Sequence, residues 1–173
     1  MMLVPAAEGD LEAVAALINS AYRGEASRQG WTTEADFIDG LRTDASHLCR
    51  ELAAKPGAMI LTLRANESGP PLGCLWLEPE ERGAWYLGML SVRPDMQDRG
   101  FGRLMLTAAE DFARARGAKI MQMTVIGIRE ELIAWYRRRG YVPTGEIKPF
   151  PPGDGMWTPK RDDLELLVLE KAL

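Results

Sequence analysis

Apolar residues recur at helical spacing near the start of the chain and at strand-like spacing further on. Residues 11–22 carry apolar side chains every three or four positions, which predicts an amphipathic helix. Three apolar segments follow, at residues 58–64, 72–77 and 85–92, and short polar turns separate them. These segments predict three consecutive strands, of which the first two form a hairpin.

The second half of the chain alternates between the two patterns. Residues 103–116 have one apolar face and predict a helix, whereas residues 119–125 alternate as a strand does. A further helix is predicted over residues 129–139, and residues 164–169 are nearly all apolar, as in a buried strand. The order of elements indicates a mixed α/β fold with an antiparallel meander, a βαβ crossover and a closing strand.

Two stretches lack a long periodic pattern of apolar residues. Residues 33–41, with Thr33 as a helix cap, predict a short helix. Residues 149–159 contain four prolines and two glycines, and therefore predict a loop or lid. No segment has the length of an interdomain linker, so we expect one domain over residues 1–173.

Composition narrows the class of protein. The chain is 46% hydrophobic and 27% charged, as in ordinary globular proteins, and its formal net charge of −4 does not suggest a nucleic-acid-binding protein. No apolar run approaches a membrane span, and the first residues do not resemble a signal peptide. Cys49 and Cys74 form no CxxC motif. We therefore expect a cytoplasmic protein with reduced cysteines, no metal and no membrane partner.

A turn with two glycines lies between the strand at residues 85–92 and the helix at residues 103–116. Glycine allows the backbone to approach a ligand closely, and the free N–H groups of a helix start attract anions. Arg99 and Arg103 add positive charge. The turn therefore has the chemistry of a pyrophosphate site, although two glycines also occur in simple turns. Its residues are Gln97, Asp98, Arg99, Gly100, Phe101 and Gly102.

Two nucleotide-binding motifs fit this turn poorly. A P-loop needs Lys-Ser or Lys-Thr after its last glycine, but Arg103 and Leu104 stand there. A dinucleotide fingerprint needs a third glycine, and Met105 takes its place.

The turn and a later segment together resemble the GNAT superfamily of N-acetyltransferases. Gln97-x-x-Gly100-x-Gly102 is similar to the family's Q/R-x-x-G-x-G/A signature. Residues 132–141, which contain Trp135-Tyr136 and Gly140-Tyr141, resemble its late FYxxxGF helix. The resemblance covers roughly residues 84–146. It implies a GNAT-like acyltransferase fold, with a mostly antiparallel central sheet and a splayed βαβ cleft for acetyl-CoA.

The resemblance also implies a reaction and the residues that take part. Acetyl-CoA is the expected co-substrate, held at its pyrophosphate by Gln97 to Gly102 and Arg103. The segment Leu90-Ser91-Val92 is expected to bind the cofactor, with Leu90 and Val92 offering main-chain groups to pantetheine and to the thioester carbonyl. Tyr136 matches the family tyrosine that faces the sulfur, which makes it the expected general acid. From the residues alone, Tyr136 is interpreted as a core aromatic on a helix beside Trp135.

Three further positions have less certain roles. Glu78 is the first candidate for a general base, because residues 85–92 contain no acid. Arg129 stands where the family often has Asn, and is open to a CoA phosphate, a substrate carboxylate or solvent. Arg137, Arg138 and Arg139 either face a CoA phosphate or are solvated cations at a helix end.

The acceptor lies outside the resemblance. Tyr22, Trp31 and Trp157 are the expected substrate-binding residues. The expected acceptor is a primary amine of a small molecule or of a peptide N-terminus, and a homodimer is expected only by analogy. Two alternatives remain: a non-catalytic acyl-CoA-binding or regulatory module on the same fold, and a nucleotide-binding α/β protein.

Overall fold

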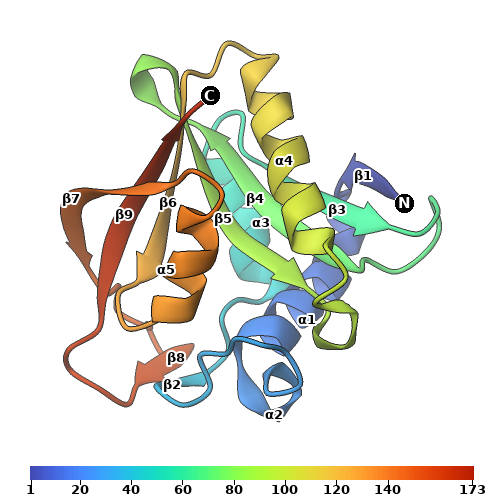
Figure 1. The fold of residues 1–173 in the computed structure, drawn as a ribbon. Helices are drawn as coiled ribbons and strands as arrows, with labels where there is room; N and C mark the ends of the chain where they lie inside the picture. Colours follow the sequence, from blue (N-terminus) through green and yellow to red (C-terminus); the bar gives the residue numbers. More distant parts are fainter.

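The computed structural model describes residues 1–173 and is organised around one large sheet (Figure 1). Seven strands lie in the order β1-β3-β4-β5-β6-β9-β7. All neighbouring pairs are antiparallel except β5 and β6, which are parallel. The bounds are β1 Met2–Pro5, β3 Met59–Arg64, β4 Gly73–Pro79, β5 Ala84–Val92, β6 Ile120–Ile126, β7 Val142–Pro149 and β9 Glu165–Ala172.

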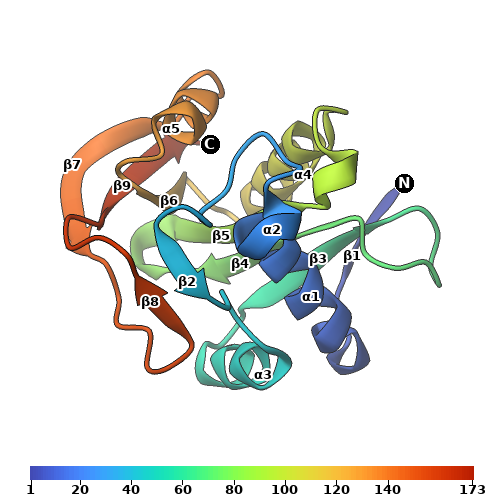
Figure 2. The ribbon, with the colours of Figure 1, turned by 90° about the horizontal axis from the view of Figure 1, so that it is seen from below.

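Helices cover both faces of this sheet. Figure 2 shows α4 and α5 on one side and α1 and α3 on the other. Two separate apolar clusters match this division: Met105 of α4 packs in one, and Val14 of α1 packs with Trp76 of β4 in the other. The bounds are α1 Leu11–Tyr22, α2 Gly24–Ser27, α3 Ala45–Ala54, α4 Phe101–Arg114 and α5 Glu130–Arg137.

Strands β5 and β6 separate part of the way along their length. Their pairing runs only from Ala84↔Ile120 to Tyr86↔Gln122. Beyond that point β6 pairs with β9 alone, and β5 changes register against β4 between Cys74 and Trp76. Met89 in this stretch has a left-handed φ of +50°, and the extra residue of β5 at this bulge bends the strand. The sheet therefore opens, and one edge of β5 has main-chain groups with no partner strand.

A second, two-stranded sheet lies beside the opening. Strand β2 (Ile38–Gly40) pairs with β8 (Trp157–Pro159) in antiparallel register. The short helix predicted over residues 33–41 is therefore wrong, and the predicted loop at residues 149–159 ends in a strand. Each strand is three residues long, too short for periodicity to show, and the pairing joins distant segments of the chain.

The other predicted elements are confirmed. The hairpin, the meander, the βαβ crossover and the final strand are all present, within a mixed open sheet, but only Val168 and Leu169 of the final strand are buried. None of the helices has the length and hydropathy needed to cross a membrane.

Candidate active site

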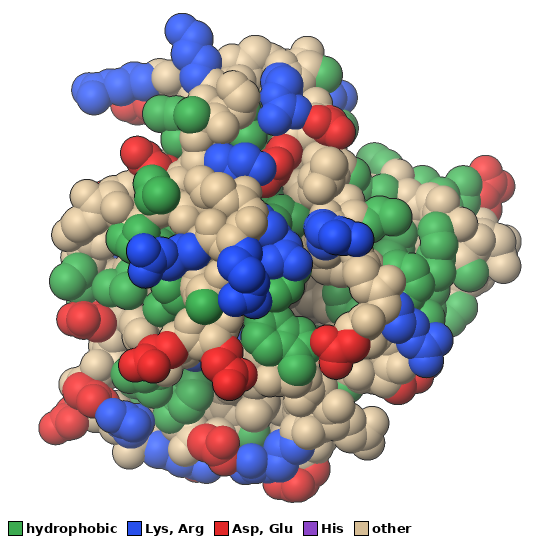
Figure 3. Space-filling model, in the orientation of Figure 1, with side chains coloured by type: hydrophobic (Ala, Val, Ile, Leu, Met, Phe, Trp, Pro, Cys, Tyr) green, Lys and Arg blue, Asp and Glu red, His purple; other side chains and the backbone are tan.

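A cavity of about 580 Å³ lies where β5 and β6 separate, between α4 and α5. All of the residues predicted to bind the cofactor line it, together with Tyr22, Trp31 and Tyr136. Figure 3 shows several Lys and Arg side chains gathered near the middle of this face. The lining residues on the predicted cofactor side are Leu90, Ser91, Val92, Gln97, Asp98, Arg99, Gly100, Phe101, Gly102 and Arg103.

The glycine turn directs the start of α4 toward this cavity. Gly100 is the N-cap residue, and its φ of +81° is in the left-handed region that favours glycine. No side chain caps the helix, so the first N–H groups of α4 have no side-chain acceptor. With the positive end of the helix dipole behind them, these groups form a site for an anion.

Three arginines around the turn add positive charge. Arg99, Arg103 and Arg139 line the cavity, and none of them forms an ion pair with a carboxylate. Burial lowers the pKa of Arg139, and the positive charges of Arg138 and Arg103 lower it further. The sequence left the roles of residues 137–139 open; Arg139 lines the cavity, whereas Arg137 and Arg138 are exposed.

Gln97 of the predicted signature makes two contacts within the protein. Its side-chain nitrogen donates to the Val92 carbonyl at 3.1 Å, and its side-chain oxygen accepts from the Trp31 N–H at 3.0 Å. The Trp31 ring lies 6.5 Å from that of Trp135 on α5. Gln97 therefore joins the segment before β2 to strand β5, and Trp31 lies at the first cavity, beside the turn.

Tyr136 on α5 is buried, and its ring packs edge-on against Trp135 and Tyr141. Burial raises the pKa of Tyr136 well above that of a free phenol. Because the phenol keeps its proton at neutral pH, it can donate that proton to a leaving group. Tyr22, Tyr86 and Tyr141 each have a hydrogen-bonding partner for their hydroxyl, whereas the Tyr136 hydroxyl has none in the protein.

A second cavity, of about 110 Å³, adjoins the first. The two share Tyr22, Leu90, Arg129, Leu132 and Tyr136, so they meet at the point where β5 bends. The Tyr22 hydroxyl donates to the Leu90 carbonyl at 3.3 Å, and burial raises the pKa of Tyr22 to about 12. Trp157 lines this second cavity and not the first. The predicted acceptor residues are thus divided between the two.

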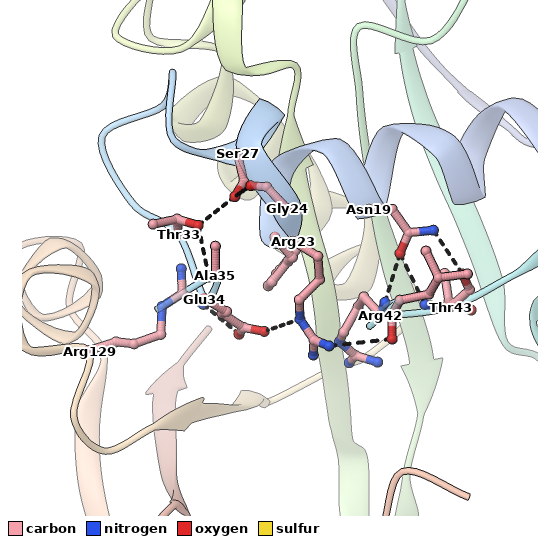
Figure 4. Close-up of polar contacts among 12 residues, drawn as sticks. Asn19, Arg23, Gly24, Ser27, Thr33, Glu34, Ala35, Arg42, Thr43 and Arg129 are labelled. Carbon is pink, nitrogen blue, oxygen red and sulfur yellow. Dashed lines mark hydrogen bonds and ion pairs between the residues drawn. The ribbon is translucent and has the colours of Figure 1, made fainter. Parts of the chain in front are cut away.

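A buried ion-pair network borders the second cavity (Figure 4). Glu34 accepts from Arg23 at 3.0 Å and from Arg129 at 2.9 Å, and all three side chains are at most 7% exposed. Arg129 also donates to the Thr32 hydroxyl at 2.8 Å. The alternatives for Arg129 were a CoA phosphate, a substrate carboxylate or solvent, and the structure instead pairs it with Glu34 inside the protein. Sequence reasoning missed Arg23 and Glu34, because both stand in polar surroundings that suggest exposure.

Glu78 lies elsewhere. Its carboxylate accepts from Lys55 and from the Trp76 indole, each at 3.0 Å, and it borders a separate open hollow near the other end of β5. Neither cavity that contains Tyr136 includes Glu78. The structure therefore does not bring the predicted base to the predicted acid.

Comparisons with known proteins agree on the class that the fold and the site define. Residues 12–141 match the profile of the Acetyltransferase (GNAT) family. The chain belongs to the GNAT acetyltransferase family.

Two relatives are named after different compounds. The mycothiol acetyltransferase of Beutenbergia cavernae is 31% identical over 161 residues, which cover 82% of this chain and 52% of that protein. The chain thus spans about half the length of that relative. The IAA acetyltransferase of Azospirillum brasilense is 28% identical over 111 residues, which cover 63% of this chain and 71% of that protein.

Solved structures share the fold at low identity. One crystal structure is provisionally named a phosphinothricin N-acetyltransferase. It aligns with a TM-score of 0.72 at 19% identity, over 99% of this chain and 98% of that one. A GNAT family acetyltransferase from Elizabethkingia anophelis with acetyl-CoA bound aligns with a TM-score of 0.60 at 16% identity, over 73% and 82%. At such identities the likeness concerns the fold alone.

Proposed function

We propose that this protein transfers the acetyl group of acetyl-CoA to a primary amine, with Tyr136 as the general acid. One observation carries the proposal: a single cavity joins an anion site to a buried phenol. The uncapped start of α4, Arg103 and Tyr136 all line this cavity. The residues from Leu90 to Val92, on the free edge of β5, line it as well.

The reaction is a direct attack at the thioester carbonyl. The amine nitrogen forms a bond to the carbonyl carbon, and the C–S bond breaks as the tetrahedral intermediate collapses. A main-chain N–H of β5 near Leu90 stabilises the negative charge on the carbonyl oxygen. Tyr136 donates its phenolic proton to the departing sulfur, the excess proton of the amine passes to solvent, and solvent returns a proton to Tyr136.

The attacking amine reaches the carbonyl in its neutral form. Glu34 is the one carboxylate that lines the second cavity, and both of its oxygens accept from arginines. It is therefore a poor general base. Arg23, Arg42 and Arg129 line the same cavity. Their positive charges disfavour an ammonium ion and favour the neutral amine, which reduces the need for a base such as Glu78.

Two measurements on the wild-type protein test this proposal. Acetyl-CoA raises the melting temperature, whereas ATP and NAD do not, because only a ligand of the folded state stabilises it. A panel of primary amines is then assayed for release of free CoA thiol and for the N-acetyl product by mass spectrometry. Stabilisation by ATP or NAD in place of acetyl-CoA contradicts the proposal. Binding of acetyl-CoA without release identifies a non-catalytic acyl-CoA-binding module instead.

A further inference from the structure

The second cavity has more positive charge than its own residues neutralise. Arg23, Arg42 and Arg129 contribute three guanidinium groups, and Glu34 contributes the one carboxylate. Glu34 is shared between Arg23 and Arg129, which leaves an excess of two positive charges. Buried and half-buried cations are normally paired, so an unbalanced cluster in a cavity indicates an anionic ligand.

Arg42 is the arginine without a partner. Its side chain forms no ion pair and no hydrogen bond within the protein, although its backbone N–H donates to Asn19 at 2.7 Å. Figure 4 shows the Arg42 guanidinium beside that of Arg23, and the charge of Arg42 contributes, after burial, to a lowered pKa of Arg23. This like-charge contact is unfavourable in the free protein, and an anion between the two groups removes the repulsion.

Two buried donors of the same cavity also lack acceptors. Arg129 Nε and Trp157 Nε1 are inaccessible to solvent and make no hydrogen bond. A buried donor without a partner costs about 1–3 kcal/mol. The unsatisfied groups around this cavity are therefore donors, and the complementary ligand is rich in acceptors. A carboxylate fits, since its two oxygens offer roughly four lone-pair sites and match the fork of a guanidinium.

We propose that the acceptor is a small amine that carries a carboxylate, and that the Arg42 guanidinium binds this carboxylate in the second cavity. A free amino acid is the simplest such molecule. The volume of about 110 Å³ suits a small group rather than a long chain. Because the cavity meets the first at Tyr136 and Leu90, a carboxylate held there leaves the amine facing the thioester. This inference rests on the proposed acetyl transfer.

The test compares amino acids with their amides and with their decarboxylated amines, for several side chains. The amide removes the negative charge and mimics a peptide N-terminus. Its amine is also less basic, so its intrinsic reactivity at neutral pH favours the amide. Faster acetylation of the acid, measured as kcat/KM by thiol release, therefore reports recognition of the carboxylate. Equal or faster acetylation of the amide or the decarboxylated amine overturns the inference and leaves the proposed function standing.

The variant Arg42→Gln assigns the recognition to one residue. We expect the KM for the amino acid to rise by about ten-fold to a hundred-fold, as for loss of a charge-assisted contact, with a smaller change in kcat. The KM for the decarboxylated amine does not rise. Arg42→Lys restores part of the affinity, because it keeps the charge and loses the fork. An unchanged preference for the acid in Arg42→Gln contradicts the role of Arg42.

Controls distinguish failure of the role of Arg42 from failure of the proposed function. Arg50→Gln changes an exposed arginine on α3, outside both cavities, and leaves every constant unchanged. Stabilisation by acetyl-CoA is the same in Arg42→Gln and in the wild type, since Arg42 does not line the first cavity. If no amine of any set releases thiol, the proposed function fails and this inference fails with it.

Discussion

The two cavities meet at Tyr136 but are built in different ways. The larger is formed mainly by two short parts of the chain, residues 90–103 and 129–139, with Tyr22 and Trp31 at its border. The smaller takes residues from six regions, which extend from Tyr22 in α1 to Leu166 in β9. The larger presents an uncapped helix start and a free strand edge, whereas the smaller has three arginines and one glutamate among its lining residues.

This difference suggests that the larger cavity binds acetyl-CoA and that the smaller cavity determines the choice of acceptor. Main-chain groups and glycines bind a part of a ligand that is common to many reactions, because a backbone offers the same donors whatever the side chains are. Side chains collected from distant segments define a charge pattern that a few substitutions can change. We therefore expect substitutions around the larger cavity to alter acetyl-CoA binding or chemistry, and substitutions around the smaller to alter the choice of acceptor.

Tyr136→Phe gives the largest expected effect. Removal of the phenol leaves the departing sulfur without its proton donor, and general acid catalysis contributes about 10²–10⁴-fold. We expect kcat to fall by about a hundred-fold or more, while acetyl-CoA still raises the melting temperature as in the wild type. Burial raises the pKa of Tyr136, so the wild-type acid remains protonated, and activity does not fall, as the pH rises through 10, the value for a free phenol.

Tyr141→Phe is the matched control. It removes a hydroxyl from a ring 5.8 Å from that of Tyr136 and outside both cavities. Because this hydroxyl donates to Glu110 at 2.9 Å, the variant loses stability but keeps its kcat at a temperature where it is folded. Unchanged turnover in Tyr136→Phe rules out the acid role, and Tyr22, the other phenol that lines both cavities, becomes the residue to test.

Glu34→Gln tests whether the smaller cavity depends on its ion pairs. This substitution leaves Arg23 and Arg129 buried without a counter-charge, and breaking a buried pair costs about 3–5 kcal/mol. We expect the free energy of unfolding, measured by urea denaturation, to fall by this order. Glu25→Gln is the control: Glu25 pairs with Arg28 at the surface, where its side chain is 90% exposed, and no change is expected. Equal stability of the two variants contradicts a structural role for the network.

The same contrast explains what could be predicted from the sequence. Strands β3, β4, β5, β6 and β9 follow from apolar segments that are long enough to show a period, as at residues 85–92, whereas β7 is exposed along its whole length. The cofactor turn is contiguous, so Gly100 and Arg103 are close in space because they are close in the chain. The geometry of a contiguous motif depends mostly on the motif itself. The residues predicted to bind acetyl-CoA do line one cavity.

The remainder depends on contacts between distant segments. The pairing of β2 with β8 joins Ile38 to Pro159, and no local pattern in either segment indicates it. Glu34 and Arg129 likewise meet only in the folded protein. Glu78 is the first candidate for a base because residues 85–92 contain no acid, but its carboxylate lies with Lys55. The type of a residue alone does not predict the direction in which its side chain points.

A pair of glycine substitutions at the two ends of α4 gives the smallest effect and sharpens the contrast furthest. Gly100 and Gly117 have nearly equal left-handed φ values of +81° and +84°, and neither position has a neighbour closer than 4.0 Å to an added Cβ. Alanine therefore adds similar backbone strain at both, about 1–2 kcal/mol, which urea denaturation measures. Only Gly100 lines the larger cavity.

We expect Gly100→Ala to weaken acetyl-CoA binding by about five- to ten-fold, as measured by calorimetry, because relief of the strain turns the first N–H groups of α4 away from the anion site. Gly117→Ala loses similar stability and keeps the wild-type affinity. Because the two variants have similar strain, a difference in their affinity for acetyl-CoA does not come from lost stability alone. Equal affinity in the two variants excludes the glycine turn as the pyrophosphate site. The larger cavity then does not bind acetyl-CoA through the main-chain groups of this turn.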